Sequence, residues 1–304
     1  MPRHDTATLR SLQHVAAICD TTPSSSNAAW RAALVARDLG LPLLLLQPRP
    51  REDALTHAGA AAALRERFRE QLGVATSVVR SDGDALAQLV SITRQGLLVL
   101  PSQRGGPLLG RIFGTDADRV IRLARGPVLV VKQAARASYR RVLTACDLQE
   151  RSELLLGAGA ALARRAQVAV VHALPTAPEL ALQEIDAAPG VVREHRLRRA
   201  ARARAAIDTL AATHAASQAH AEVQPEVLPV VVFGSPARMI VSSAQAARSD
   251  LVVIGKRRRG LLADFFLGGV TRRVLADAQC DVLVVPLAAG VASAGAGQPR
   301  VAAA

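Results

Sequence analysis

Short apolar runs alternate along the chain with longer segments that have helical periodicity. The run at 282–285 is apolar at every position, which is typical of a strand covered by helices on both faces. The second half also contains apolar residues spaced by three and four, on one face of a helix: Leu197, Ala200, Ala203, Ile207 and Leu210. Strands and helices that alternate in this way predict βαβ units and a parallel sheet.

The same pattern predicts five strands and four helices in each half of the chain. In the first half we expect strands near 13–19, 42–47, 74–80, 97–100 and 127–131, and helices near 26–39, 52–72, 84–95 and 115–124. In the second half we expect strands near 140–146, 167–172, 227–232, 250–254 and 281–285, and helices near 150–165, 190–214, 236–248 and 269–278. The predicted fold class is α/β, with two Rossmann-like domains, each a five-stranded parallel sheet flanked by helices on both faces.

The two halves also repeat each other in sequence. Gly114 recurs as Gly268 and the run 128–131 recurs as 282–285, both at an offset of 154 residues. Earlier in each half an apolar run ends in Cys-Asp, first at 19–20 and then at 146–147. This repetition predicts one domain over 12–133 and a second over 139–287, joined by a short linker. The segment 288–304 is rich in Ala, Gly and Ser, and we expect it to be a disordered tail.

Candidate ligand-binding residues recur at equivalent places in the two halves. An open parallel sheet binds ligands outside the carboxyl ends of its strands, where the strand order reverses. The first strand of each half ends at an acid, Asp20 or Asp147, whose carboxylate can accept hydrogen bonds from a ribose or an adenine amine. The loop after the fourth strand enters a helix at Gly114-Thr115 or Gly268-Gly269, where small residues let phosphate oxygens approach free backbone N–H groups.

The second half resembles a universal stress protein domain. The motifs that carry the resemblance are DLVVIG at 250–255, FLGGVTRRVL at 266–275 and QCDVLVV at 279–285. The first half repeats this pattern, so the resemblance covers nearly the whole chain apart from its two ends. It implies two domains of the HUP type. In nucleotide-binding members of the family, the loop after the fourth strand reads Gly, two residues, Gly, nine residues, Gly, then Ser or Thr.

Both loops depart from that family pattern. The second domain has Gly255, then Arg258 in place of the second glycine, and Gly269 in place of the hydroxyl residue. The first domain has Pro101 and Arg104 in place of the first two glycines. An arginine adds bulk there, but it also places a guanidinium beside the expected phosphates. The resemblance implies a nucleotide site framed by Asp147, Gly255, Arg258, Gly268 and Gly269, with counterparts Asp20, Gly114 and Thr115 in the first domain.

The composition limits other functions. The formal net charge of +13 raises the question of nucleic-acid binding, but aromatic residues make up only 2% of the chain, which leaves few rings for bases to stack on. Lysine accounts for two of the 38 basic residues, so the basic charge is almost entirely arginine. We therefore disfavour a nucleic-acid partner. A long apolar segment is absent from the sequence, and so we expect no membrane partner and a cytoplasmic location.

The three cysteines, Cys19, Cys146 and Cys280, are too widely spaced for a disulfide framework or a zinc site. We expect buried, reduced thiols and no structural metal. No nucleophile, base and orienting acid occur in a recognisable arrangement, so we expect a protein that is not an enzyme, with weak ATPase activity left open.

Two functions remain in view. The first is a stress-response protein that binds ATP or another adenine nucleotide, and the alternative is a nucleotide-free interaction module of the same fold. The resemblance also implies assembly through the last strand of each domain, at 128–131 and 282–285. That assembly would join either two chains as a homodimer or the two domains of one chain.

Overall fold

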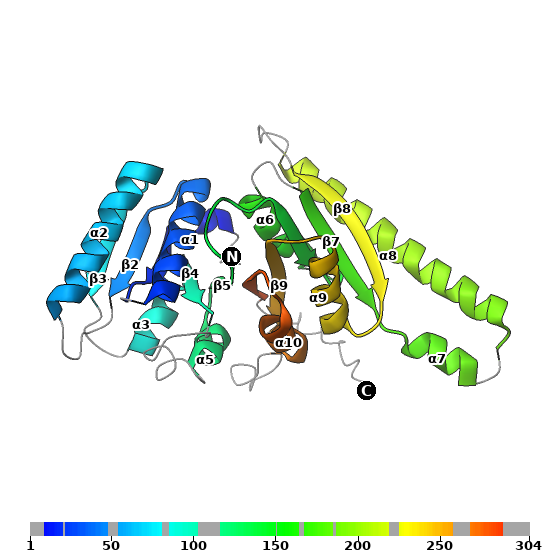
Figure 1. Cartoon of the computed structure of the whole chain (residues 1–304). Coiled ribbons are helices and arrows are strands. Elements are labelled where there is room, and N and C mark those ends of the chain that lie inside the picture. Colours follow the sequence, from blue (N-terminus) through cyan, green and yellow to red (C-terminus); the bar gives the residue numbers. More distant parts are fainter. Residues whose placement is uncertain are drawn as a thin grey trace, which may run out of the picture.

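The structure, a computed structural model, describes residues 9–20, 22–47, 54–80, 85–102, 116–149, 151–163, 167–184, 187–218, 225–257 and 268–287. Ten strands form one sheet in the order β3-β2-β1-β4-β5-β10-β9-β6-β7-β8 (Figure 1). Each half therefore repeats the order 3-2-1-4-5 of a doubly wound α/β domain, with all neighbours inside a half parallel. The predicted fold class is confirmed, and the two five-stranded sheets form a continuous one.

The elements of the first half follow the predicted alternation. A short 3-10 turn, η1 (Leu9–Ser11), precedes the strands β1 (His14–Ile18), β2 (Leu43–Gln47), β3 (Thr76–Arg80), β4 (Gly96–Pro101) and β5 (Val128–Val131). The described helices between them are α1 (Pro23–Leu39), α2 (Ala54–Leu72), α3 (Ala85–Ile92) and α5 (Asp116–Leu123). Helix α1 begins three residues before its predicted start because Thr22 caps it, accepting a hydrogen bond from the Ser25 N–H at 3.2 Å, with Pro23 in the first turn.

The second half has an additional helix. Its strands are β6 (Arg141–Ala145), β7 (Gln167–Leu174), β8 (Glu226–Phe233), β9 (Leu251–Arg257) and β10 (Asp281–Leu287). Its helices are α6 (Ser152–Leu162), α7 (Ala177–Glu184), α8 (Pro189–Ser217), α9 (Pro236–Ala246) and α10 (Gly269–Asp277). The sequence pattern missed α7, a helix of eight residues that precedes the long helix α8. Helix α8 runs along β8 at the outer edge of the sheet (Figure 1).

The two halves join through their last strands. Strand β5 pairs with β10 in the antiparallel direction, with Leu129 opposite Leu283. These two leucines are themselves 154 residues apart, so equivalent residues face each other across a pseudo-twofold axis. The internal pairing that the sequence left open is therefore the one observed. Both edges of β5 and of β10 are occupied, so a homodimer, which stays a prediction, would have to use another surface.

The apolar core lies on the two faces of this sheet. One cluster packs α1, α2, α6 and α8 against one face, and the other packs α3, α5, α9 and α10 against the opposite face. Each cluster contains residues from both halves, so the two domains share their core layers. Within the described ranges, no helix has the length and apolarity needed to span a bilayer.

A buried polar network anchors the junction, and we call it the Asp281 network. The Asp281 carboxylate, which is fully buried, accepts hydrogen bonds from the backbone N–H groups of Lys132 (2.7 Å) and Gln133 (2.9 Å) and from the Tyr139 hydroxyl (2.7 Å). Arg31 Nε lies 3.0 Å from Asp281 Oδ2 as an ion pair, without the alignment of a hydrogen bond. Helix α1 of the first domain is thereby connected to β10 of the second.

The two lysines of the chain also bridge the domains. Lys256 Nζ donates to the carbonyls of Ile121 (2.7 Å), Arg122 (2.6 Å) and Ala124 (3.0 Å), at the end of α5. Lys132 Nζ donates to the carbonyls of Leu275 (2.6 Å) and Ala278 (2.7 Å), at the end of α10. Each lysine thus places a positive charge at the negative end of a helix in the other domain.

Candidate functional site

A cavity of about 560 Å³ lies in the second domain, outside the carboxyl ends of β6, β7 and β9. Strand order reverses between β6 and β9, so the cavity occupies the position where doubly wound sheets bind ligands. Four of the predicted site residues line it together: Asp147, Gly255, Gly268 and Gly269. Its other walls are mostly apolar and include Leu155, Val171, Ile240 and Leu287. This combination of apolar walls and a few polar groups is typical of small-molecule sites.

Asp147 lies at the mouth of the cavity, directly after β6. Its side chain is exposed, and Oδ1 accepts a hydrogen bond from the Gln149 N–H at 3.2 Å. The next residue, Leu148, has a φ of 57°, a left-handed conformation that is uncommon for leucine. The chain therefore turns sharply after Asp147 and leaves the carboxylate accessible to a ligand.

His172, near the end of β7, also lines the cavity and, like Asp147, carries a titratable side chain. Its Nδ1 lies 2.9 Å from the carbonyl oxygen of Cys146. When Nδ1 donates to that carbonyl, Nε2 of the neutral ring is left as an acceptor. Burial, with the neighbouring Asp147 charge, raises the pKa of the Cys146 thiol to about 12, so this sulfur stays protonated at neutral pH.

The start of α10 forms one side of the cavity. Gly268 is the N-cap of this helix, and a Cβ atom built on Gly268 or Gly269 would meet no other atom within 4 Å. Neither glycine has a positive φ. The absence of side chains therefore leaves open space in front of the helix N-terminus, where backbone N–H groups and the helix dipole attract anions.

Gly255 has a packing role. A Cβ atom there would lie 2.6 Å from Leu287 Cδ1 and 3.3 Å from Leu155 Cδ1, so a larger residue would force both leucines to move. The Gly255 carbonyl accepts a hydrogen bond from the Thr271 hydroxyl at 3.2 Å, which connects β9 to the first turn of α10. The resemblance implied that Gly255 helps to frame a nucleotide site; in the structure it lines the cavity, and its close packing accounts for glycine at this position.

Asp20, the residue of the first domain equivalent to Asp147, is buried and hydrogen-bonded within its own turn. Asp20 is only 5% exposed, and its Oδ1 accepts hydrogen bonds from the N–H (2.8 Å) and hydroxyl (2.5 Å) of Thr22. Its own N–H donates to the Ser25 hydroxyl at 2.9 Å. Asp20 therefore stabilises the turn into α1. Gln149 stands in the second domain where Thr22 stands in the first, so the position that gives Asp20 a hydroxyl donor carries no hydroxyl beside Asp147.

Three of the predicted site residues, Arg258, Gly114 and Thr115, lie outside the described residues. The cavity also contains residues that the predicted site omitted, chiefly His172 and Thr271. His172 ends a predicted strand, and that position could have identified it. Thr271 comes two residues after Gly269 and has no comparable signal. Among the described residues there is no group of three His, Cys, Asp or Glu side chains that could hold a metal ion.

The described fold and cavity define a class of protein: fused, doubly wound α/β domains with a ligand-sized cavity at a strand-order switch. Residues 138–286 match the model of the Universal stress protein family. The chain belongs to this family through its second domain, and the family resemblance seen in the sequence is confirmed.

Individual relatives agree with this assignment. A universal stress protein of Thermus aquaticus is 38% identical over 56 residues, and Sll1388 of Synechocystis, also a universal stress protein, is 44% identical over 55 residues. Each match covers 18% of this chain, and they cover 41% and 36% of the two relatives. The chain therefore spans less than half the length of these curated relatives.

Solved structures match over more of the chain. A functionally unknown protein from Pseudomonas aeruginosa PAO1 aligns with a TM-score of 0.62 and 22% identity, over 91% of this chain and 94% of that one. A universal stress protein from Archaeoglobus fulgidus aligns with a TM-score of 0.54 and 14% identity, over 90% and 96%. At these identities the likeness concerns the fold.

Proposed function

We propose that this universal stress protein binds ATP or a related adenine nucleotide in the second-domain cavity, as a stress-response protein. The observation that carries the proposal is the convergence of Asp147, Gly268 and Gly269 on one cavity at the strand-order switch. Asp147 lies more than 100 residues before the two adjacent glycines in the sequence, and the carboxylate and the helix start suit different parts of a nucleotide.

The chemistry of the cavity is suited to such a ligand. Its apolar walls, including Val171 and Ile240, can cover a purine ring. The Asp147 carboxylate can accept hydrogen bonds from ribose hydroxyls or an adenine amine. Backbone N–H groups at the start of α10, in front of Gly268 and Gly269, can receive phosphate oxygens. The volume of about 560 Å³ lies within the usual range of small-molecule sites.

We propose binding without turnover. Among the described residues that line the cavity, the titratable side chains are those of Asp147, His172 and the buried Cys146. The ring of His172 contacts the Cys146 backbone carbonyl and not a hydroxyl or thiol, which differs from the arrangement of a catalytic triad. Nucleotide would then act by changing the conformation or partners of the protein.

The direct test is calorimetric titration with ATP. Asp147→Asn removes the carboxylate charge, and we expect the Kd to rise roughly tenfold to a hundredfold, the equivalent of losing a charged hydrogen bond. Gly268→Val places a side chain in the open space before α10, and we expect a similar loss. Asp20→Asn is the matched control, because Asp20 serves the α1 turn and its substitution should leave the Kd within about twofold.

The proposal fails if wild-type protein shows no binding at millimolar ATP, or if Asp147→Asn and Asp20→Asn bind equally well. The competing function, a nucleotide-free interaction module, draws support from Gly255, whose packing against Leu287 explains that glycine without a ligand. Native mass spectrometry of gently purified protein separates the two. A co-purified adenine compound supports the nucleotide site, whereas consistently empty protein favours the interaction module.

A further inference from the structure

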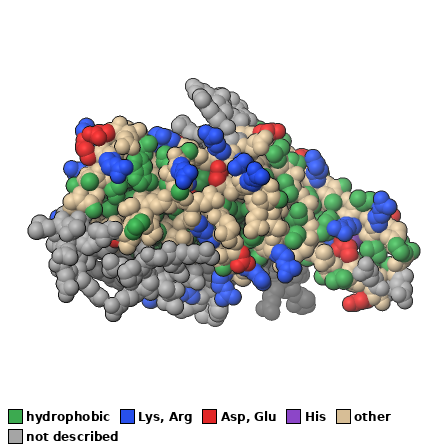
Figure 2. All heavy atoms as spheres, in the orientation of Figure 1, with side chains coloured by type: hydrophobic (Ala, Val, Ile, Leu, Met, Phe, Trp, Pro, Cys, Tyr) green, Lys and Arg blue, Asp and Glu red, His purple; other side chains and the backbone are tan. Residues whose placement is uncertain are grey.

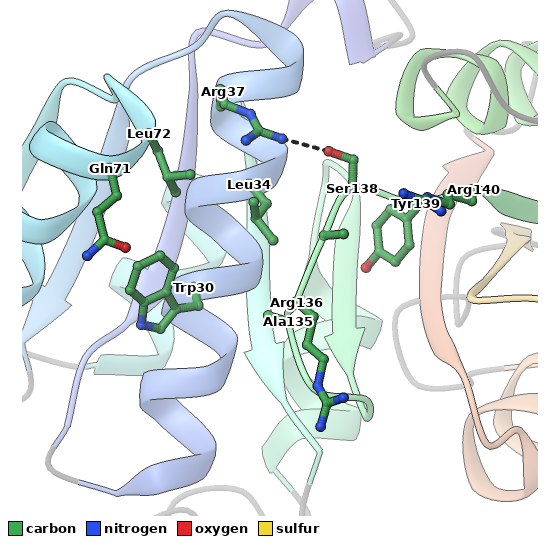
Figure 3. Close-up of a pocket in the computed structure, with 11 residues that line it drawn as sticks. Trp30, Leu34, Arg37, Gln71, Leu72, Ala135, Arg136, Ser138, Tyr139 and Arg140 are labelled. Carbon is green, nitrogen blue, oxygen red and sulfur yellow. Dashed lines mark hydrogen bonds between the residues drawn. The ribbon is translucent and has the colours of Figure 1, made fainter.

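A second cavity, of about 730 Å³, lies in the first domain, far from the second-domain site in the sequence (Figure 3). One side is formed by Trp30, Leu34 and Arg37 of α1 and by Gln71 and Leu72 at the end of α2. The other side is formed by the connecting segment between β5 and β6, at 135–140. We call it the Arg136 cleft.

The cleft is strongly basic. Arg37, Arg136 and Arg140 line it, and none of the described aspartates or glutamates does. Arg37 is already engaged, since it bonds to the Asp38 carboxylate and reaches across the cleft to the Ser138 hydroxyl at 2.7 Å (Figure 3). The guanidinium groups of Arg136 and Arg140 make no hydrogen bond or ion pair with any described residue. The Asp250 carboxylate accepts a hydrogen bond from the Arg140 backbone N–H at 2.8 Å, but neither guanidinium forms an ion pair with a described residue. The two arginines therefore give the concave site a positive potential that attracts anions.

The domain repeat explains why the cleft is open. When Cys19 is aligned with Cys146, Leu9 corresponds to Arg136 and Leu12 to Tyr139. Leu9 and Leu12 are buried, and the turn η1, which contains Leu9, packs against α6. In the connecting segment, Tyr139 keeps the buried role, whereas an exposed arginine replaces Leu9. A buried apolar side chain in the first copy is thus replaced in the second by a cationic side chain that lines the cavity.

The wall that carries these arginines is rigidly held. Asn27 donates to the Gln133 carbonyl at 2.8 Å and accepts from the Ala135 N–H at 2.8 Å. Arg31 Nη1 donates to the Ala137 carbonyl at 2.6 Å. A wall that is already ordered loses little conformational entropy when a ligand binds, which favours affinity.

We propose that the Arg136 cleft binds a metabolite-sized anion carrying two or more carboxylate or phosphate groups. The guanidinium groups of Arg136 and Arg140 contact the charged groups, which they can bind through paired hydrogen bonds. The volume of the cleft exceeds what a single inorganic phosphate would fill and suits a larger molecule. A ligand held there bridges α1 and the connecting segment, beside the Asp281 network that joins the domains.

The test uses Trp30, which lines the cleft and is the only tryptophan of the chain. Its fluorescence is followed while benzene-1,3,5-tricarboxylate or pyrophosphate is added at about 0.15 M salt, where exposed surface charges are largely screened. Equilibrium dialysis of the same two probes measures binding independently of fluorescence. The two probes distinguish carboxylate from phosphate preference.

We expect a saturable change with at least one probe, and a Kd raised roughly tenfold or more in the Arg136→Ala/Arg140→Ala double variant. A matched control, Arg198→Ala/Arg273→Ala, removes two arginines that are 69% and 65% exposed elsewhere, and should keep the Kd within about twofold. Circular dichroism confirms that the variants fold.

Two outcomes overturn the proposal: no binding of either probe by dialysis at millimolar concentration, or equal weakening in both double variants, which would indicate general charge attraction. The result is independent of the ATP site, since Asp147→Asn should leave binding of these probes unchanged.

Discussion

Replacing Asp281 with asparagine removes one negative charge from the buried junction of the two domains. Asparagine keeps an oxygen that can accept the N–H groups of Lys132 and Gln133, so those bonds survive. The amide cannot compensate the charge of Arg31, whose guanidinium is 4% exposed and cannot turn to water. Arg31 also lies over the Tyr139 ring, 4.4 Å from its centroid, and so is held on that side as well.

The size of the effect follows from this geometry. Removing one partner of a buried ion pair costs about 3–5 kcal/mol, because the other charge is left uncompensated. We therefore expect the free energy of unfolding to fall by about 3–5 kcal/mol in Asp281→Asn. Adding Arg31→Met removes the orphaned cation, so the double variant should lose at least about 1 kcal/mol less than the sum of the two single variants.

The assay is equilibrium unfolding in urea, followed by two signals. Circular dichroism reports the whole chain, and Trp30 fluorescence reports α1 of the first domain. Because Asp281 belongs to the second domain but contacts α1, both transitions should shift together. Asp277→Asn is the control: its carboxylate is 52% exposed in a 3.5 Å surface pair with Arg273, and its loss should cost less than about 0.5 kcal/mol.

Either of two results would refute this reasoning. A loss below about 1 kcal/mol for Asp281→Asn would mean that water or a neighbouring group compensates Arg31. A shift of the dichroism transition without a shift of the Trp30 transition would mean that the network does not couple the domains.

Three further predictions concern the same junction and the buried thiols. Lys256→Met and Lys132→Met should each lower the free energy of unfolding by about 2–4 kcal/mol, because each ammonium donates hydrogen bonds to carbonyls at a helix end. Urea unfolding measures this loss, and a value below about 1 kcal/mol in both variants would contradict the prediction. Burial, and then the Asp281 charge, raises the pKa of Tyr139 well above 10.0. The neutral Tyr139 hydroxyl therefore contributes its full stabilisation of the folded state below about pH 10, and this contribution is lost as the pH rises further. Tyrosinate absorbance, which only this tyrosine can give, should appear together with alkaline unfolding, and its appearance near pH 10 in folded protein would refute the assignment. Burial raises the pKa of the three thiols to about 11 or 12, so thiol labelling at neutral pH should proceed only after unfolding, and rapid labelling of native protein would show that a thiol is accessible.

Figure 2 gives a physical picture of the high positive charge. On the visible face, basic side chains are interspersed with acidic and hydrophobic ones over both halves of the molecule. The net charge of +13 therefore gives the total charge of the protein but not where the charged side chains lie on its surface. The Arg136 cleft is a local exception, produced where the two domain copies differ: Arg136 corresponds to Leu9, and Arg140 to Gln13.

The sequence alone determined the fold class, because the periods of strands and helices are local properties of consecutive residues. It also indicated the strand end at Asp147 and the helix start at Gly268, since the domain repeat aligns them with Asp20 and Gly114. The short helix α7 was not among the predicted elements, although α3 and α5, which have the same length, were.

Only the tertiary structure decided how the two copies differ in use. Asp20 and Asp147 end equivalent strands, but Thr22 engages one carboxylate while the turn at Gln149 leaves the other accessible. The Asp281 network joins Arg31 to a residue 250 positions later, a contact that no local pattern can encode. The pairing of β5 with β10 was likewise open in the sequence, because an apolar edge strand can be satisfied by its own chain or by another, and only the spatial arrangement selects between them.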